Sequence, residues 1–242
     1  MKRTTSILLA LCLAALCLAP FAFAGEAAAN TQEFTCTTQL SHFIQEPSPS
    51  SEVRIGPAVL STVGGDRDVY VLTICGIDWL ARGSNNFSSY LSALFNRKSA
   101  YFDVVKRSVL ENIPEGSAIV AYGHSLGGMM LQQIVCDGDL TEKYEFVNAV
   151  TFGSPCVGTD KSAREGTLVR LEDKSDIVPK ISFASADSEV TRRGGNYGID
   201  ISGAHNVSYK RDDIWGSFDV LGVDGGSAKL TLDLDSLQNL QA

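Results

Sequence analysis

In the segment Ala121-Tyr-Gly-His-Ser-Leu-Gly-Gly128, the end of an apolar run leads into a serine that lies between glycines. Glycine on both sides of a serine lets a chain turn sharply from a strand into a helix. Such a turn pushes the Ser125 hydroxyl out of the sheet and leaves the backbone N–H of Leu126 at the helix N-terminus, where it can hold an oxyanion. The motif therefore predicts a nucleophile elbow with Gly123 and Gly127 as its small residues.

The elements around this motif decide between an elbow and a tight packing turn, which is the alternative. Two strand-like runs, 53–63 and 68–74, flank Gly64-Gly65-Asp66 and predict a hairpin. Further strands are predicted at 118–122, 146–152 and 168–171, with helical spacing within 87–112 and at 126–136. Strands that alternate with helices predict a single α/β domain with a doubly wound, mostly parallel sheet. The alternating tail at 228–234 predicts one more strand, at an edge of the sheet.

A serine hydroxyl is a poor nucleophile until a base removes its proton, and the chain offers three histidines for that role. His124 lies inside the elbow and is expected to point away from Ser125. His42 lies ahead of the sheet. His205 follows on the C-terminal side, as the hydrolase order of nucleophile, acid and base requires. His205 is therefore the predicted base.

The acid is expected between the serine and the histidine, on a loop that follows a strand. Asp176 fits this place, because Ile177-Val178-Pro179 directly behind it would anchor the loop against the sheet. The competing carboxylates are those of Glu172, Asp173 and Asp200. Asp176 is the predicted acid.

Four motifs in this order resemble the class 3 (fungal-type) lipases of the α/β-hydrolase fold. They are Gly123 to Gly128, Thr151-Phe-Gly-Ser-Pro155, Asp176-Ile-Val-Pro179, and His205 near Tyr209. The resemblance runs from about Val53 to Tyr209. It implies an α/β-hydrolase that cleaves lipid esters through an acyl-enzyme, as a triacylglycerol lipase does, without a metal or an organic cofactor. It also implies Ser125 as nucleophile, Asp176 as acid and His205 as base, in agreement with the choice made from the residues alone.

One position departs from the family pattern. In that family, a glycine followed by serine or threonine after the third strand supplies the second oxyanion donor, whereas this chain has Gly76-Ile77. Only the backbone N–H of Ile77 can then fill that role, together with the N–H of Leu126. The missing hydroxyl leaves alternatives open: a phospholipase A1 or short-chain esterase on the same fold, or a catalytically idle module that binds lipid or a protein partner.

The segment from Asp78 to Phe95 follows the oxyanion position directly. In fungal lipases this place bears an amphipathic lid that opens at a lipid surface, and Trp79 resembles a lid tryptophan. The later aromatic residues have the spacing of a helix packed on the sheet, which favours an ordinary helix. A lid, and with it a transient contact with a lipid surface, stays an open expectation beside the lipid ester substrate.

The N-terminus has the three-part layout of a secretory signal peptide, with Lys2 and Arg3, an apolar run over 7–19, and Ala22-Phe-Ala24. A membrane anchor is the alternative, but the run is shorter than the ~20 residues that a spanning helix needs. We expect a signal peptide over 1–24, a leader over 25–51 and the hydrolase domain over 52–242. The protein is then secreted or periplasmic, without a transmembrane anchor after cleavage.

The net charge and the cysteine spacing argue against nucleic acid and metal ions as partners. Twenty Lys and Arg against 28 Asp and Glu give a net charge of −8, which argues against nucleic-acid binding. Cleavage after residue 24 leaves Cys36, Cys75, Cys136 and Cys156, which allow one or two disulfides in an exported chain. No cysteine spacing resembles a zinc site, so no metal is expected.

Overall fold

One mixed sheet runs through the part of the chain that the structure describes. The structure is a computed structural model and describes residues 30–46, 52–77, 83–159, 164, 166–184 and 190–240. Its nine described strands are β1 (Thr31–Phe34), β2 (Val53–Thr62), β3 (Gly65–Ile74), β4 (Ala118–His124), β5 (Glu145–Phe152), β6 (Thr167–Asp173), β7 (Val190–Arg193), β8 (Lys229–Asp233) and β9 (Gln238–Leu240). Their spatial order is β1-β8-β2-β3-β4-β5-β6-β7, with β9 paired to β2.

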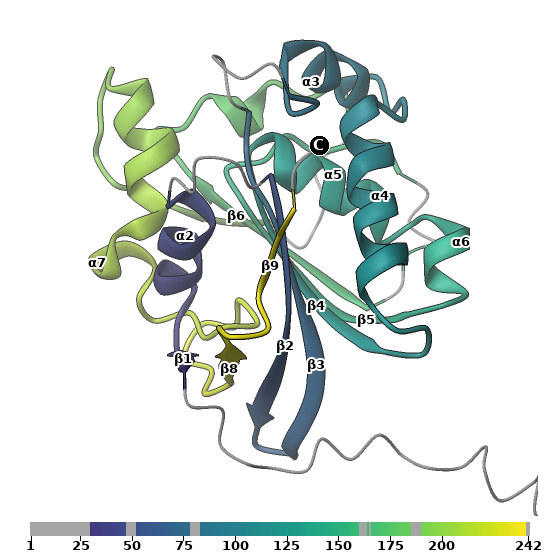
Figure 1. Cartoon of the computed structure of the whole chain (residues 1–242). Coiled ribbons are helices and arrows are strands. Elements are labelled where there is room, and N and C mark those ends of the chain that lie inside the picture. The colour runs from purple at the N-terminus through teal and green to yellow at the C-terminus, as the bar shows by residue number, and fades with distance from the viewer. Residues whose placement is uncertain are drawn as a thin grey trace, which may run out of the picture.

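The strands that follow the β2–β3 hairpin are parallel. Each pair from β3 to β7 is parallel, whereas β1, β8, β2 and β9 pair antiparallel at the other side of the sheet. Parallel strands end at the same edge, and in Figure 1 that edge is the upper end of the molecule. The loops that follow β3, β4, β5 and β6 therefore converge there, and the predicted site residues lie on or after these loops, except Gly123, which lies at the end of β4.

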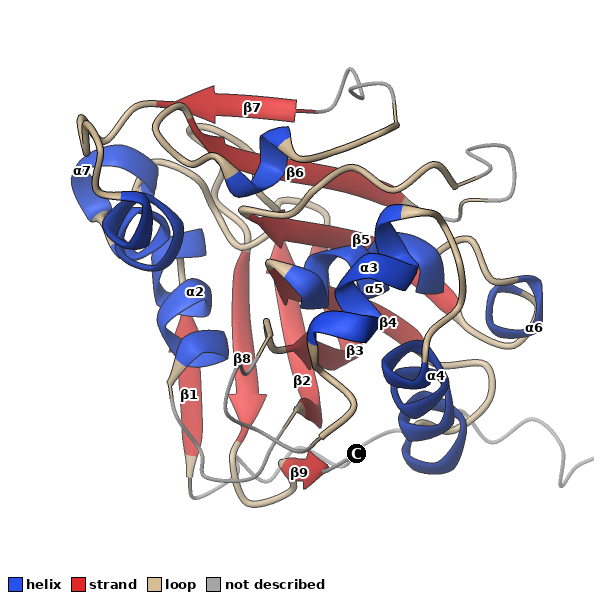
Figure 2. Cartoon of the chain, turned by 90° about the horizontal axis from the view of Figure 1, so that it is seen from above, coloured by secondary structure: helices blue, strands red, loops and turns tan. Residues whose placement is uncertain are grey.

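Helices cover both faces of the sheet. The described α-helices are α2 (Thr37–Gln45), α3 (Phe87–Leu94), α4 (Ala100–Asn112), α5 (Leu126–Ile134), α6 (Gly138–Thr141) and α7 (Asp212–Trp215). The described residues also form three other helical turns, η2 (Val178–Lys180), η3 (Gly203–Val207) and η4 (Ser208–Lys210). Figure 2 shows α3, α4 and α5 on one side of the sheet and α2 with α7 on the other. Two clusters of buried apolar side chains match these two layers, one under α3 to α5 and one under α2 and α7. The predicted fold class, a doubly wound α/β-hydrolase-type domain, is confirmed.

The central strand β4 shows why the apolar run before the elbow forms a strand. Every residue of β4 is buried. Ile119 and Ala121 pack in the cluster under α4 and α5, while Val120 and Tyr122 pack in the cluster under α2 and α7. A strand buried on both faces has no polar side, so its sequence is an unbroken apolar run instead of an alternating one.

The helical stretch expected within 87–112 is divided into α3 and α4. Asn86 caps α3 by accepting the Ser89 N–H at 3.2 Å, and Ser99 caps α4 by accepting the Phe102 N–H at 3.1 Å. Between the two helices, Asn96 takes a positive φ of 51°. A left-handed residue and a second N-cap end one helix and start another, although the apolar spacing continues through both.

The predicted tail strand forms as β8, but its predicted place at the edge is wrong. β1 pairs with β8 on its outer side, from Thr31 opposite Asp233 to Phe34 opposite Leu230. β1 and α2 also reach into the core, where the Phe34 ring meets the Phe43 ring edge-on with centroids 5.3 Å apart. The segment that was expected to be a leader thus supplies a strand and a buried helix. Residues 1–29, including the expected signal peptide, lie outside the described residues.

Replacing the buried Phe34 side chain tests whether β1 contributes to the stability of the fold. Phe34 is fully buried, so we expect Phe34→Ala to lower the free energy of unfolding by about 3–5 kcal/mol, through lost burial and the cavity left behind. Val63, at the hairpin tip, is 98% exposed, and Val63→Ala should stay within about 0.5 kcal/mol of the parent protein. Urea unfolding followed by circular dichroism measures both changes. Equal stability of the two variants would contradict a structural role for β1.

Candidate active site

The elbow lies between β4 and α5, in a strained backbone conformation. Ser125 has φ 54° and ψ −120°, a region that residues with a side chain rarely adopt. The turn is held by the Ser125 N–H, which donates to the carbonyl of Phe152 on β5 at 2.9 Å. A serine before a helix commonly caps it, but the Ser125 side chain makes no cap hydrogen bond to α5. Its hydroxyl is directed elsewhere.

The two elbow glycines allow α5 to lie against the sheet. A Cβ on Gly123 would lie 2.7 Å from the backbone of Gly127, and a Cβ on Gly127 would overlap the carbonyl oxygen of Ile74. Both contacts are with backbone, which cannot move aside as a flexible side chain can. Glycine is therefore required at both positions by the approach of the helix to β3 and β4.

The Ser125 hydroxyl, the His205 imidazole and the Asp176 carboxylate form one hydrogen-bonded row. His205 Nε2 lies 2.9 Å from Ser125 Oγ, and His205 Nδ1 lies 2.8 Å from Asp176 Oδ2. Ser125 and Asp176 are buried, while the His205 side chain is 13% exposed. The three groups come from the elbow, from the loop after β6 and from the turn over Gly203–Val207. The spacing suits a nucleophile, a base and an acid that orients the base.

Asp176 is fully buried, and its charge is supported by more than the histidine. Its Oδ1 accepts the Val178 N–H at 2.9 Å, and its Oδ2 accepts the Tyr209 hydroxyl at 2.8 Å. Burial, and the negative charge of Asp176 after it, raise the pKa of Tyr209 well above its ordinary value, so the phenol stays protonated and donates. Val178 begins a short 3-10 helix, Val178–Lys180, which overlaps the stretch Ile177-Val178-Pro179 that was expected to anchor this loop. A buried carboxylate is tolerated when its oxygens are hydrogen-bonded in this way.

Tyr209 and Gly153 are residues whose part in the site the sequence did not reveal. Gly153 has φ +60°, and a Cβ there would lie 2.9 Å from Asp176 Oδ2 and 2.8 Å from the Tyr209 ring. Its glycine therefore leaves room for both partners of the acid. Both residues stand in motifs quoted for the family resemblance, but no spacing rule links either of them to Asp176.

The competing carboxylates are engaged by other groups. Glu172 accepts from Arg170 at 2.6 Å and from Arg192 at 2.9 Å. Asp173 accepts the Ser208 hydroxyl and the Ser175 N–H.

Asp200, the third competitor, accepts the Gly203 N–H at 2.8 Å and so supports the turn that carries His205. Of the four candidate acids, Asp176 is the one that the structure brings to the His205 ring.

The other two histidines, His42 and His124, are not placed to act as the base. His42 is on the exposed side of α2. His124 is buried, and its Nε2 lies 2.9 Å from the carbonyl oxygen of His205. Burial, with the nearby His205 as the next cause, lowers the pKa of His124 to about 3. His124 is therefore neutral at pH 7 and does not face the serine hydroxyl as a base would.

The two expected oxyanion donors lie at the elbow and beside it. Leu126 is the first residue of α5, so its N–H has no carbonyl partner within the helix. The segment 75–77 runs past the elbow so closely that a Cβ on Gly76 would lie 3.2 Å from the Ser125 Cβ. Ile77 follows Gly76, and its side chain packs on the cluster under α3 to α5. The geometry is compatible with an oxyanion held between the two backbone segments.

The helix α3 lies next to this site. Burial, with the charge of Asp176 as the second cause, raises the pKa of Tyr90 on α3. Ala93 and Leu94 are buried, while Phe87, Leu91 and Phe95 are 41–61% exposed. The Phe95 ring stacks on that of Phe183, from the loop after Asp176, with centroids 5.3 Å apart. Residues 78–82, with Trp79, lie outside the described residues, so the lid remains a prediction.

Within the described ranges, no three His, Cys, Asp or Glu side chains are grouped so that they could hold a metal ion. No helix among those same residues is both long enough and apolar enough to cross a bilayer.

The fold and the row of serine, histidine and aspartate side chains define a protein of the α/β-hydrolase type. Residues 75–186 match the model of the family described as Lipase (class 3), which confirms the resemblance drawn from the motifs. The matched segment includes Ser125 and Asp176 and ends before His205. A search of curated proteins and a search of solved structures found no match. The family match indicates a lipase-type ester hydrolase with a lipid ester as substrate.

Replacing Gly127 by alanine tests whether the elbow requires a glycine at this position. We expect Gly127→Ala to lower the free energy of unfolding by more than about 2 kcal/mol, because the new Cβ meets the Ile74 carbonyl. Gly138 begins α6 and has open space around it, so Gly138→Ala should change stability by less than about 1 kcal/mol, in the favourable direction. Thermal and urea unfolding measure both. A Gly127→Ala protein as stable as Gly138→Ala would show that the elbow tolerates a side chain.

Proposed function

We propose that the protein is an exported serine hydrolase that cleaves carboxylic esters of lipids through an acyl-enzyme. The observation that carries the proposal is the unbroken row from Ser125 Oγ to His205 Nε2 at 2.9 Å and from His205 Nδ1 to Asp176 Oδ2 at 2.8 Å. The class 3 lipase match supports a lipid ester as the substrate. A triacylglycerol is the proposed lipid class, with a phospholipid or a short-chain ester as the alternatives on the same fold.

The first half of the proposed reaction forms the acyl-enzyme. His205 Nε2 takes the proton of the Ser125 hydroxyl while Oγ bonds to the ester carbonyl carbon. The carbonyl oxygen becomes an oxyanion that accepts hydrogen bonds from the N–H groups of Leu126 and Ile77. The tetrahedral intermediate then collapses, the bond to the alcohol oxygen breaks, and the alcohol leaves with the proton from His205.

The second half of the proposed reaction releases the carboxylic acid and restores the free enzyme. A water molecule gives a proton to His205 and attacks the acyl carbon, and Ser125 leaves as a hydroxyl after taking that proton back. Throughout, Asp176 keeps the proton of the imidazole on Nδ1 and stabilises the positive charge that His205 acquires. Its hydrogen bond from Tyr209 keeps the carboxylate in place.

Export is the part of the proposal that depends on the N-terminus alone. Lys2, Arg3, the apolar run over 7–19 and Ala22-Phe-Ala24 support a signal peptide that is cleaved after Ala24. Such a signal serves both release from the cell and a periplasmic location.

A rival of another class is an idle hydrolase-fold module that binds lipid or a protein. Its support is the missing hydroxyl after Gly76, where Ile77 replaces the family's serine or threonine. The intact row of Ser125, His205 and Asp176 argues against it, because a binding module has no need of a base aligned on a serine.

The serine is tested with p-nitrophenyl esters from short to long acyl chains. We expect Ser125→Ala to lower kcat by at least about 10⁴-fold, because the nucleophile is lost. Ser227 is an exposed serine in the loop before β8, so the Ser227→Ala protein should hydrolyse the esters as fast as the parent protein. Rates that peak at long chains support a lipase or phospholipase, and rates that peak at short chains support an esterase. Full activity in a pure Ser125→Ala preparation would contradict the proposal.

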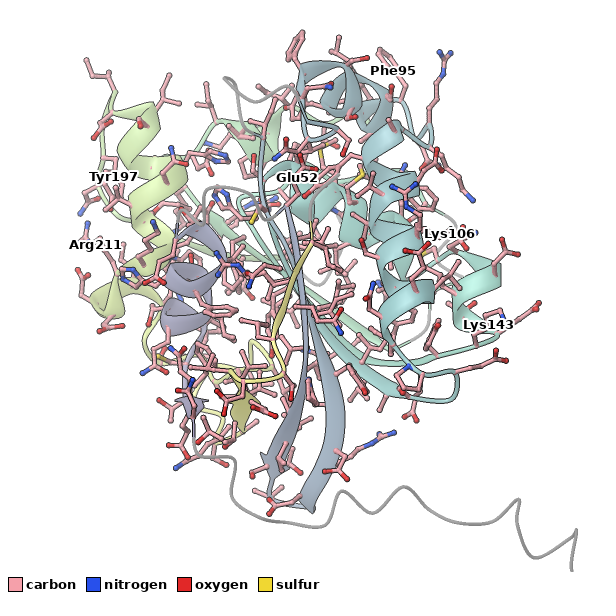
Figure 3. The ribbon with its side chains drawn as sticks, viewed as in Figure 1. Glu52, Phe95, Lys106, Lys143, Tyr197 and Arg211 are labelled. Atoms are coloured by element: carbon pink, nitrogen blue, oxygen red, sulfur yellow. The ribbon has the colours of Figure 1, made fainter. Side chains whose placement is uncertain are left out.

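A transient contact with a lipid surface is supported by apolar side chains on segments next to the row. Large exposed apolar residues come from α3, from the loop after Asp176 and from the segment around His205: Phe87, Leu91, Phe95, Ile177, Ile181, Phe183, Ile199, Ile201 and Val207. Figure 1 shows α3 and the yellow-green segment around residue 205 at the same upper end, and Phe95 is labelled there in Figure 3. Exposed apolar side chains that come from neighbouring segments at one end of a molecule support an interaction surface there. The net charge of −8 favours neutral over anionic lipid surfaces.

Replacing two of these side chains tests the contact. In a double variant, Phe183→Ser with Ile199→Ser, we expect the ratio of activity on a triacylglycerol emulsion to activity on a dissolved short-chain ester to fall about tenfold. Each large apolar side chain that enters the lipid contributes about 1.5–3 kcal/mol at full burial, so two partly buried ones account for this loss. Val63→Ser, at the hairpin tip, should leave the ratio as it is. An unchanged ratio in the double variant would place lipid contact elsewhere.

A further inference from the structure

His124 is a buried imidazole that the proposed reaction does not use. It lies directly before Ser125 and is 5% exposed, and its ring packs against the His205 ring with centroids 4.8 Å apart. The Tyr209 ring lies on another side, with centroids 6.1 Å apart. A buried polar ring that touches both the base and the support of the acid is well placed to influence their positions.

The hydrogen bond of His124 defines its tautomer. Its Nε2 lies 2.9 Å from the backbone carbonyl oxygen of His205, and a carbonyl oxygen only accepts, so Nε2 carries the proton and donates. Nδ1 is then the unprotonated nitrogen. It faces Gly76, where a Cβ would lie 3.1 Å from it. The ring thus fills the space between the segment that precedes Ile77 and the turn that carries the base.

The turn that carries His205 is a π-helical turn, Gly203–Val207. In such a turn the backbone is wider than in an α-helix, and π-helical turns recur at functional sites. The carbonyl that accepts from His124 belongs to His205 itself. The His124 side chain, directly before the nucleophile, is therefore hydrogen-bonded to the backbone of the base.

We infer that His124 is a positioning residue, whose Nε2–H holds the backbone of His205 at the distance from which the imidazole reaches Ser125. The inference rests on the proposed function. The reach matters because a displacement of about 1 Å between reacting groups can cost about 100-fold in rate. The ring also suits this place by its neutrality, since a cation beside His205 would oppose the imidazolium that forms during the reaction.

The test compares two side chains of similar length, one with an N–H donor and one without. His124→Gln keeps a donor that can reach the His205 carbonyl, whereas His124→Met fills a similar volume and donates nothing. With a dissolved short-chain p-nitrophenyl ester, we expect His124→Met to lower kcat about 10- to 100-fold with little change in KM. His124→Gln should recover most of that loss.

Titration with a fluorophosphonate separates positioning from misfolding. The final labelled fraction counts folded sites, and the rate of labelling reports activation of the serine. We expect His124→Met to label fully but slowly, with kcat per labelled site reduced. A His124→Met protein that matches the parent in kcat per labelled site, or a His124→Gln protein as slow as His124→Met, would overturn the inference. Failure of the proposed function is distinct, since the parent protein would then not hydrolyse the ester, or Ser125→Ala would keep the esterase activity.

Discussion

The rest of the site depends on one backbone constraint, the turn at Ser125 with φ 54°, which lies between a buried strand and a helix pressed against the sheet. The helix can approach because Gly127 has no side chain to meet the Ile74 carbonyl. This approach fixes the turn from Ser125 into α5, whose first residue, Leu126, has no carbonyl partner for its N–H within the helix. The strain of the turn is opposed by the Ser125 N–H bond to Phe152 and by the two buried clusters on either face of the sheet.

A second constraint is the burial of a carboxylate opposite the elbow. Asp176 is removed from water, and its oxygens accept from Val178, Tyr209 and His205. Each of these donors belongs to a different turn, so the acid connects the loop after β6 to the segment that carries the base. On the proposed function, the same bonds that make the buried charge tolerable also hold the imidazole in the tautomer that can accept the proton of the serine.

Much of this architecture could be predicted from local sequence. Unbroken apolar runs indicated β3, β4 and β5, because strands covered on both faces have no polar side. The order of serine, acid and histidine then selected Ser125, Asp176 and His205 as candidates. Other features of the structure depend on contacts between segments that are distant in sequence. β1 pairs with β8, about 200 residues later in the chain, the Tyr209 hydroxyl donates to Asp176, and His124 donates to the carbonyl of His205. No periodicity or spacing rule encodes such pairs, which follow only once the sheet is assembled.

Labelling with a fluorophosphonate, followed by peptide mass spectrometry, is the direct test of whether His205 activates Ser125. We expect one equivalent of label per chain, attached to Ser125, because only a serine beside an aligned base reacts readily. We also expect His205→Ala to slow the labelling by at least about 10³-fold while circular dichroism shows an intact fold. No label on Ser125 in the folded protein, or labelling that does not depend on His205, would show that His205 does not activate Ser125.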